Sequence, residues 1–356
     1  MNKYWEKLCD IVPTLQNKKV VRATKYRGAP SKERFDPEHP LADAQTFYKE
    51  PDRDLVILNL TDMHFADFDY RYWTAFDAEK TMKRLVKTVR PDLITVTGDI
   101  VCSDSTVGAI ARFTRDMDAL GVPWAPIFGN HDDEGNCDLN YLANEMLKSR
   151  LCLFKKGDPA FGCGNYVINI AEKTDAGDRI VESLILTDSH HGGFSENQTV
   201  FFEKTAEAVN ALTGGKAELS VLCHIPTAEY EYLVPHFIDE KNGVWEEGFG
   251  GVGEKHESVC CGRDANGNPV DQGGFFEAAK RVRLAHVICG HEHLNDYSAV
   301  FEGVRHTYTL KLGMGSGFRR EFNGGTVFTV GSGGITSMAQ RCVRRGKDRD
   351  LWRLKF

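Results

Sequence analysis

Short apolar runs alternate along this chain with segments of helical periodicity. The runs 55–60 and 93–97 are rich in leucine, isoleucine, valine and threonine, as buried strands are. Between them, residues 76–89 repeat apolar side chains at the spacing of one helix face. This order of strand, helix and strand predicts a βαβ unit.

The alternation continues and then changes character near residue 295. Further strands are predicted at 124–128, 184–187, 219–223 and 285–289, and further helices at 106–120, 199–212 and 274–283. Strands joined by tight turns then follow at 297–300, 304–312, 326–330 and 352–356. The pattern predicts an α/β fold, with an α+β four-layer arrangement of two packed mixed β-sheets flanked by helices.

The same pattern divides the chain into three parts. Residues 1–50 are largely polar and are predicted to be an N-terminal extension, residues 51–340 the main domain, and residues 341–356 a C-terminal strand or tail packed on it. Glycine is dense in 243–274 and in 313–334, which predicts functional loops there.

Composition, charge and cysteine content restrict the classes of protein to which this chain can belong. With 41% hydrophobic and 27% charged residues, the 356-residue chain has the composition of a globular protein. A net charge of −7 indicates no nucleic-acid partner, and no apolar run approaches the roughly 18 residues of a membrane helix. The start of the chain has no signal-peptide pattern, and ten dispersed cysteines are typical of reduced thiols, so we expect a cytoplasmic protein without a membrane partner. The oligomeric state is not readable from the sequence.

Residues that ligate metals follow five of the predicted strands directly. The groups are Asp62-Met63-His64, Gly98-Asp99, Gly129-Asn130-His131-Asp132, His224 and Gly290-His291-Glu292-His293. Because the carboxyl ends of strands in an open α/β sheet lie along one edge, these groups are predicted to converge in a metal site there.

The residue types indicate which ions and which chemistry this site suits. Carboxylate, amide and imidazole ligands without thiolate suit transition metals such as Mn, Fe or Zn. About seven ligands are too many for one tetrahedral ion and fit two ions that share a carboxylate. We therefore predict two divalent or mixed-valence transition metal ions, and a pair of this kind suits hydrolysis of phosphate esters.

The five groups resemble the signature of the calcineurin-like metallophosphoesterases, which reads D-x-H, G-D, G-N-H-[DE], a lone H and G-H-x-H, and they are closest to its purple-acid-phosphatase-related branch. The resemblance implies the following ligands: Asp62, His64 and His293 for one metal, Asn130, His224 and His291 for the other, and Asp99 as the bridge. It also implies that His131 faces the leaving group as general acid or transition-state stabiliser, and Asp132 is predicted to orient its imidazole. Cys102 occupies the position at which purple acid phosphatases carry a tyrosine that binds ferric iron.

These observations predict an enzyme in which a metal-bridging hydroxide attacks phosphorus in line. The expected substrate is a phosphomonoester, either a small phosphorylated molecule or a phosphoprotein, with specificity set by the glycine-rich segments and the extension. Two alternatives remain open: a phosphodiesterase or nuclease of the same superfamily, and a metal-binding protein without catalysis.

Overall fold

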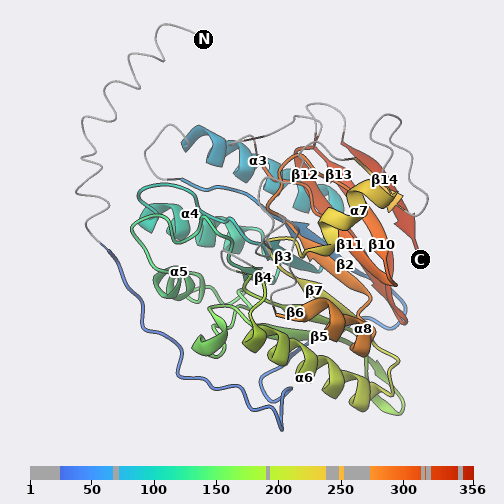
Figure 1. Ribbon diagram of the computed structural model, residues 1–356. Coiled ribbons are helices and arrows are strands. Elements are labelled where there is room, and N and C mark those ends of the chain that lie inside the picture. The colour runs from blue at the N-terminus through green and yellow to red at the C-terminus, as the bar shows by residue number, and fades with distance from the viewer. Residues whose placement is uncertain are drawn as a thin grey trace, which may run out of the picture.

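Two mixed β-sheets pack face to face, and helices cover both outer faces (Figure 1). The computed structural model describes residues 25–66, 72–189, 193–237, 248–251, 273–313, 317, 322–343 and 348–356. Helices α3 and α4 lie on one side of the paired sheets and α6 and α8 on the other. The predicted α/β class, with two mixed sheets flanked by helices, is confirmed.

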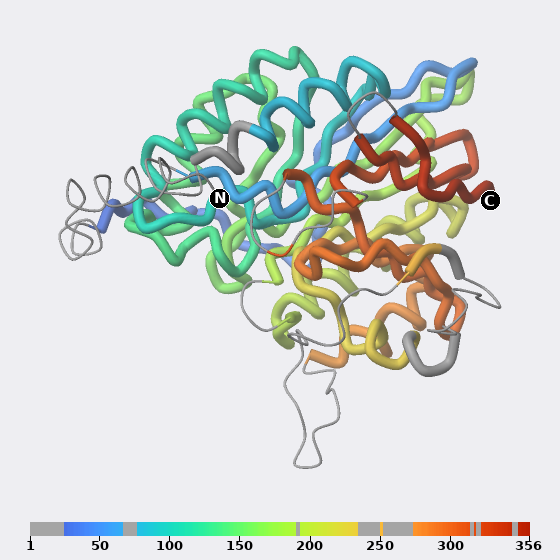
Figure 2. Tube along the Cα trace, turned by 90° about the horizontal axis from the view of Figure 1, so that it is seen from above, coloured from blue at the N-terminus to red at the C-terminus, as the bar shows by residue number. Residues whose placement is uncertain are grey.

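The first sheet has six strands in the order β14-β13-β12-β2-β3-β4. Its strands are β2 (Leu55–Leu60), β3 (Leu93–Thr97), β4 (Trp124–Ile127), β12 (Gly324–Gly331), β13 (Gly334–Cys342) and β14 (Arg349–Lys355). Strands β2, β3 and β4 run parallel, as strands joined by crossover helices do, and β12 to β14 add antiparallel hairpins at the edge of β2. Figure 2 shows the C-terminal strands, in red, beside the N-terminal part of this sheet.

The second sheet has eight strands in the order β1-β5-β6-β7-β9-β11-β10-β8. Its strands are β1 (Gln45–Lys49), β5 (Tyr166–Thr174), β6 (Gly177–Leu186), β7 (Glu218–Leu222), β8 (Gly248–Phe249), β9 (His286–Cys289), β10 (Ser298–Phe301) and β11 (Val304–Tyr308). Strands β6, β7, β9 and β11 run parallel at its centre. The sheet begins at residue 45, ahead of the predicted domain boundary at 51.

The helices pack their apolar faces against the sheets. They are α3 (Tyr72–Val89), α4 (Val107–Ala119), α5 (Leu139–Met146), α6 (Glu196–Thr213), α7 (Glu229–Phe237) and α8 (Phe275–Val282), with a 3₁₀ turn at Pro159–Phe161. Helix α6 begins in a capping box in which Ser195 and Gln198 exchange side-chain and backbone hydrogen bonds. Among the residues placed by the structure, no helix is both long enough and apolar enough to cross a bilayer.

Two apolar cores result from this layering. The larger lies between the sheets and beneath α3 and α4, where Phe113 packs edge-on against Trp124. The smaller lies beneath α6 and α8, where Phe275 stacks on Phe194 with ring centroids 4.2 Å apart. The cores hold the sheets rigid, so the carboxyl ends of their strands form a fixed edge.

The segment before β1 crosses the outer surface of the molecule. Tyr26 pairs with Cys137 and contacts the ring of Tyr141 in α5, while Phe35 packs edge-on against Phe201 of α6. The part of the predicted extension that the structure describes therefore connects the helices of both faces.

A buried ion pair lies within the eight-stranded sheet, and a hydrogen bond links it to the other sheet. Glu172 of β5 lies 2.9 Å from the ammonium of Lys49 in β1, and their side chains are 6% and 1% exposed. Arg179 of β6 also pairs with Glu172, and the hydroxyl of Ser332, in the hairpin that follows β12, donates to it at 2.8 Å. Although burial raises the pKa of Glu172, these partners lower it from 4.5 to about 2.

We expect Glu172→Gln to lower the free energy of unfolding by roughly 3 kcal/mol at pH 7, because it leaves the buried charge of Lys49 unpaired. The depressed pKa means that the carboxylate stabilises the fold fully above pH 4.5 and loses this effect as the pH falls toward 2. Urea unfolding of both proteins measures the difference, which should shrink below pH 4.5. A difference that stays constant down to pH 2 would contradict the assignment to this ion pair.

Four strands and two helices were not expected from the sequence, and the predicted loops were wrong in part. The unexpected elements are strands β1, β5, β8 and β13 and helices α5 and α7. The glycine-rich segment 313–334 was predicted as a loop, although a strand was also predicted at 326–330; it contains all of β12, which confirms that strand. Its glycines permit close approach of neighbouring strands: a Cβ on Gly324 would lie 2.0 Å from the carbonyl oxygen of Arg341. Most of the other glycine-rich segment lies outside the described residues.

Candidate metal centre

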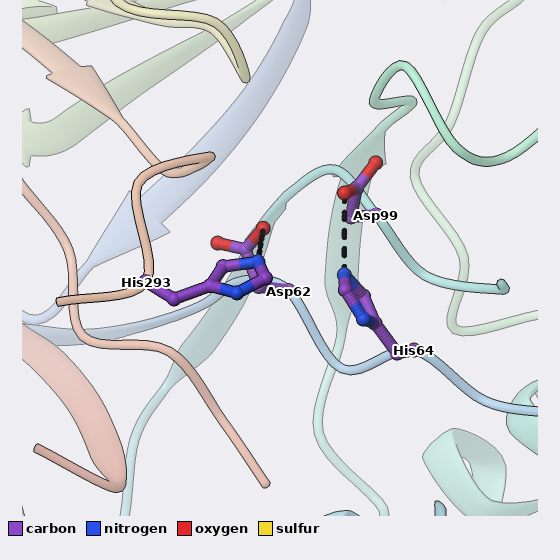
Figure 3. Close-up of side chains that lie close together, drawn as sticks. All are labelled: Asp62, His64, Asp99 and His293. Carbon is purple, nitrogen blue, oxygen red and sulfur yellow. Dashed lines mark hydrogen bonds and ion pairs between the residues drawn. The ribbon is translucent and has the colours of Figure 1, made fainter. Parts of the chain in front are cut away.

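The predicted ligand groups follow the carboxyl ends of strands in both sheets. Strands β2, β3 and β4 lead into three of the groups, and β7 and β9 into the other two. Since the sheets face each other, these five loops meet at one edge of the sandwich. Figure 3 shows four of the side chains close together, with contacts between Asp62 and His293 and between Asp99 and His64.

Asp62 forms one side of this cluster. Its Oδ1 lies 3.3 Å from Nε2 of His293, and its Oδ2 accepts hydrogen bonds from the hydroxyl of Thr61 at 2.9 Å and the backbone N–H of His291 at 3.0 Å. One ligand atom from each of Asp62, His64, Asp99 and His293 lies within 4.8 Å of the others. This spacing allows the four side chains to reach one ion.

Asp99 lies between this cluster and the remaining candidates. Its Oδ2 is 3.2 Å from Nε2 of His64 and its Oδ1 is 3.3 Å from Nε2 of His224. Nε2 of His224 in turn lies 3.1 Å from Oδ1 of Asn130, and its ring is 5.2 Å from that of His291. The structure thus brings all seven predicted ligands together, with one carboxylate in the middle. Their coordination of metal remains a prediction.

The backbone of these loops is in an uncommon conformation. Asp62, His64, Asp99 and His291 have φ angles between 50° and 76°, in the left-handed region. Such residues cost roughly 1 kcal/mol or more each, and they cluster where a site requires an exact side-chain direction.

Two glycines make room for the carboxylates. A Cβ on Gly129 would lie 2.3 Å from Oδ1 of Asp99, and one on Gly290 would lie 2.0 Å from Oγ1 of Thr61. Neither position can therefore hold a larger residue without displacing the cluster. The role of these two glycines is steric, whereas Gly98, with a φ angle of 82°, adopts a conformation that favours glycine.

Burial and neighbouring charges set the protonation of the cluster. Burial lowers the pKa of His64 to about 3, helped by the buried ammonium of Lys311, and burial lowers the pKa of His291 to about 4. Both imidazoles are therefore neutral at pH 7, the form that binds metals. Although burial alone would lower it, Asp99 raises the pKa of His224 to about 9.

The carboxylates remain ionised despite their burial. Burial raises the pKa of Asp62, but His293 lowers it more, and the net shift is downward. The pKa of Asp99 is likewise below its ordinary value, since His224 and His64 outweigh burial. Two buried anions within reach of several imidazoles are the charge arrangement that divalent cations favour.

An unsatisfied oxygen supports a metal at this position. Oδ1 of Asp62 is buried and accepts no hydrogen bond of good geometry; its contact is the ion pair with His293 at 3.3 Å, although a buried carboxylate oxygen normally accepts a hydrogen bond. A cation would supply that partner. The donor set, its burial and its charge therefore fit two transition metal ions.

The predicted role of Asp132 needs correction. Its carboxylate is fully buried and accepts hydrogen bonds from the backbone N–H groups of Val101 at 2.8 Å and Gly129 at 2.7 Å. The carboxylate beside the His131 ring belongs to Glu134, whose Oε2 lies 2.8 Å from Nδ1. Asp132 thus ties two ligand loops together, and Glu134 orients the imidazole. The signal for Glu134 in the sequence was its position three residues after His131 in a turn.

Comparisons with known proteins agree with this geometry. A model of the family described as calcineurin-like phosphoesterase matches residues 55–295. The chain is 25% identical over 300 residues to the probable inactive purple acid phosphatase 28 of Arabidopsis thaliana, covering 71% of this chain and 68% of that protein. It is 24% identical over 284 residues to the phosphatase DCR2 of Saccharomyces cerevisiae, covering 71% and 46%. A probable cyclic nucleotide phosphodiesterase of Xenorhabdus bovienii is 33% identical over 101 residues, covering 26% and 40%.

Proposed function

The chain belongs to the calcineurin-like phosphoesterase family, and from this premise we propose that it is a metal-dependent phosphomonoesterase. One observation carries the proposal: seven donor side chains from five separate segments, Asp62 and Asp99 among them, lie together, and a buried Asp62 oxygen accepts no hydrogen bond of good geometry. The family is dinuclear and metal-dependent, and this chain has a complete set of donors for two ions.

In this proposal each side chain has a defined task. Asp62, His64 and His293 would hold one ion, Asn130, His224 and His291 the other, and Asp99 both. Two ions bound there would supply Lewis-acid activation of water and neutralise charge on the phosphate oxygens. The identity of the metal, Mn, Fe or Zn, is part of the proposal.

His131 would act on the leaving group. Its ring lies 5.8 Å from the ring of His64, and its side chain is 35% exposed, so it lies at the open side of the buried cluster. Because Glu134 contacts Nδ1, the Nε2–H of the imidazolium is left to donate a proton to the departing ester oxygen. The backbone N–H of His131 donates to Asp99 at 3.0 Å, which fixes the ring relative to the centre.

Some relatives are named as inactive, but nothing in the donor set of this chain requires that state. Each of the seven positions carries a residue able to bind a transition metal. For the substrate we propose a small phosphorylated molecule or a phosphoprotein. The net charge of −7 disfavours a polyanionic nucleic acid. A cytoplasmic location stays a prediction from the sequence.

A second candidate, hydrolysis of phosphodiesters, is favoured by the local similarity to the Xenorhabdus bovienii protein. Its name, a probable cyclic nucleotide phosphodiesterase, makes small diesters the relevant comparison. The same two-metal chemistry serves both ester classes, so only substrate preference separates the candidates.

The test is a hydrolysis panel on protein stripped of metal and reloaded with Mn²⁺, Fe²⁺ or Zn²⁺. We expect phosphate release from aryl monoesters and phosphopeptides that depends on added metal and exceeds hydrolysis of the matched diesters. Faster cleavage of diesters would assign the second candidate. Bound metal with no hydrolysis of any ester would contradict both and leave a metal-binding protein.

A further inference from the structure

We propose that Cys102, His131 and Glu134 form a separate site for a thiophilic divalent cation such as Zn²⁺, and that occupancy of this site inhibits the enzyme. The second part rests on the proposed function, because it assigns His131 to the leaving group. The first part concerns binding alone.

The three side chains converge beside the dinuclear centre. One ligand atom from each lies within 4.8 Å of the other two, and Nδ1 of His131 is 2.8 Å from Oε2 of Glu134. That nitrogen is buried and faces the carboxylate of Glu134, so the two ligand atoms lie close enough to share one cation. Cys102 is 8% exposed and the Glu134 side chain is 54% exposed, which leaves the carboxylate at the open end as an entry point.

The loops that carry these residues are held in place by their backbones. Asp132 accepts a hydrogen bond from the N–H of Val101, next to Cys102, and Asn136 accepts one at 2.9 Å from the N–H of Thr106. The N–H of Glu134 donates to the carbonyl of His131 at 3.3 Å, closing a turn that places both side chains on one side. Because the loops are already fixed, less conformational entropy is lost when a metal binds.

The donor set differs from that of the dinuclear centre. Thiolate, imidazole and carboxylate together suit Zn²⁺ or Co²⁺ in a tetrahedral site, whereas the seven donors around Asp99 include no sulfur. Three protein ligands leave the fourth position to water, so the ion would be exchangeable rather than structural. On binding, the Cys102 thiol releases its proton to solvent.

Binding would interfere with catalysis through His131. A cation that takes the Nδ1 lone pair prevents the ring from becoming an imidazolium, and it separates the ring from Glu134. The leaving oxygen would then lack its proton donor while the dinuclear centre stays intact. Excess Zn²⁺ is therefore expected to lower the turnover of the manganese-loaded enzyme.

Cobalt spectroscopy tests the site without reference to activity. Co²⁺ is titrated into the manganese-loaded protein, and a sulfur-to-cobalt charge-transfer band in the near ultraviolet is expected. Cys102→Ser should remove the band, Glu134→Gln should weaken Co²⁺ binding about tenfold, and Cys152→Ser, a control at a cysteine outside the cluster, should leave it unchanged. Absence of the band from the unmodified protein would overturn the site. A band that saturates without change in Glu134→Gln would place the thiolate on the dinuclear centre instead, and would also overturn it.

Zinc sensitivity tests the inhibition. With activity expressed relative to each protein's own rate in Mn²⁺, the Zn²⁺ concentration for half inhibition should rise at least about tenfold in Cys102→Ser and stay unchanged in Cys152→Ser. Equal sensitivity in all three proteins would overturn the inhibitory role. A protein that gives the cobalt band but hydrolyses no ester would retain the site while refuting the proposed function, so the two failures are distinguishable.

Discussion

Replacing Asp99 by asparagine is expected to abolish ester hydrolysis and to weaken the binding of both metals. The two oxygens of Asp99 face His64 and His224, on opposite sides of the cluster. An asparagine keeps one oxygen and loses the negative charge, so it cannot join two cations. We expect kcat to fall by at least about 10³-fold, because loss of the shared ligand removes the charge stabilisation that the metals supply.

Steady-state kinetics and metal content per chain measure this effect together. Asp92→Asn is the matched control, because Asp92 is a carboxylate that pairs with Arg53 away from the centre. It should retain full metal content and turnover. An Asp99→Asn protein that holds two metals per chain and turns over at the unmodified rate would refute the bridging role.

Replacing His131 by alanine should lower turnover by about 10²–10⁴-fold while both metals stay bound. His131 contributes its backbone N–H to Asp99, which alanine retains, and in the proposed mechanism its ring acts on the leaving group. The loss should be largest for alkyl phosphates, whose alkoxide needs a proton, and smallest for esters of acidic phenols.

Comparison of leaving groups supplies the internal control for this prediction. Glu134→Gln should show a weaker form of the same dependence, since it removes only the partner of Nδ1. Equal metal loss in the Asp99 and His131 variants would overturn the distinction between ligand and proton donor. A loss of turnover independent of the leaving group would remove His131 from that step.

The sequence predicted the elements whose residues are buried on both faces. Strands such as β2 and β3 are continuous apolar runs, and α3 repeats apolar residues along one face. Strand β5 was missed because it ends in the polar residues Glu172, Lys173 and Thr174. Glu172 is polar because it pairs with Lys49 of β1, and the other two lead into the following turn. Strand β13 was missed because Thr336, Ser337 and Gln340 interrupt its apolar pattern, and their hydrogen bonds to β12 become apparent only when the strands are paired.

The site was more predictable than the sheet edges. Its seven donors follow strands directly, so strand order alone places them at one edge. The direction of a side chain within a turn could not be predicted in this way. Asp132 is adjacent to His131 in sequence but points into the protein, toward Val101 and Gly129. The left-handed φ angles of Asp62 and Asp99 could not be predicted from the sequence either, because no local preference of those residues requires them.

Those left-handed residues have a consequence for substitution at their positions. Exchange of Asp62 or Asp99 for glycine would relieve backbone strain and remove a buried charge, while also deleting a donor. The same exchange would leave the backbone N–H groups of His291 and His131 without their carboxylate acceptors, so the relief of strain would be opposed by the loss of buried hydrogen bonds. The carboxylates whose backbones are strained thus also hold the loops of the centre in place, through the hydrogen bonds that they accept.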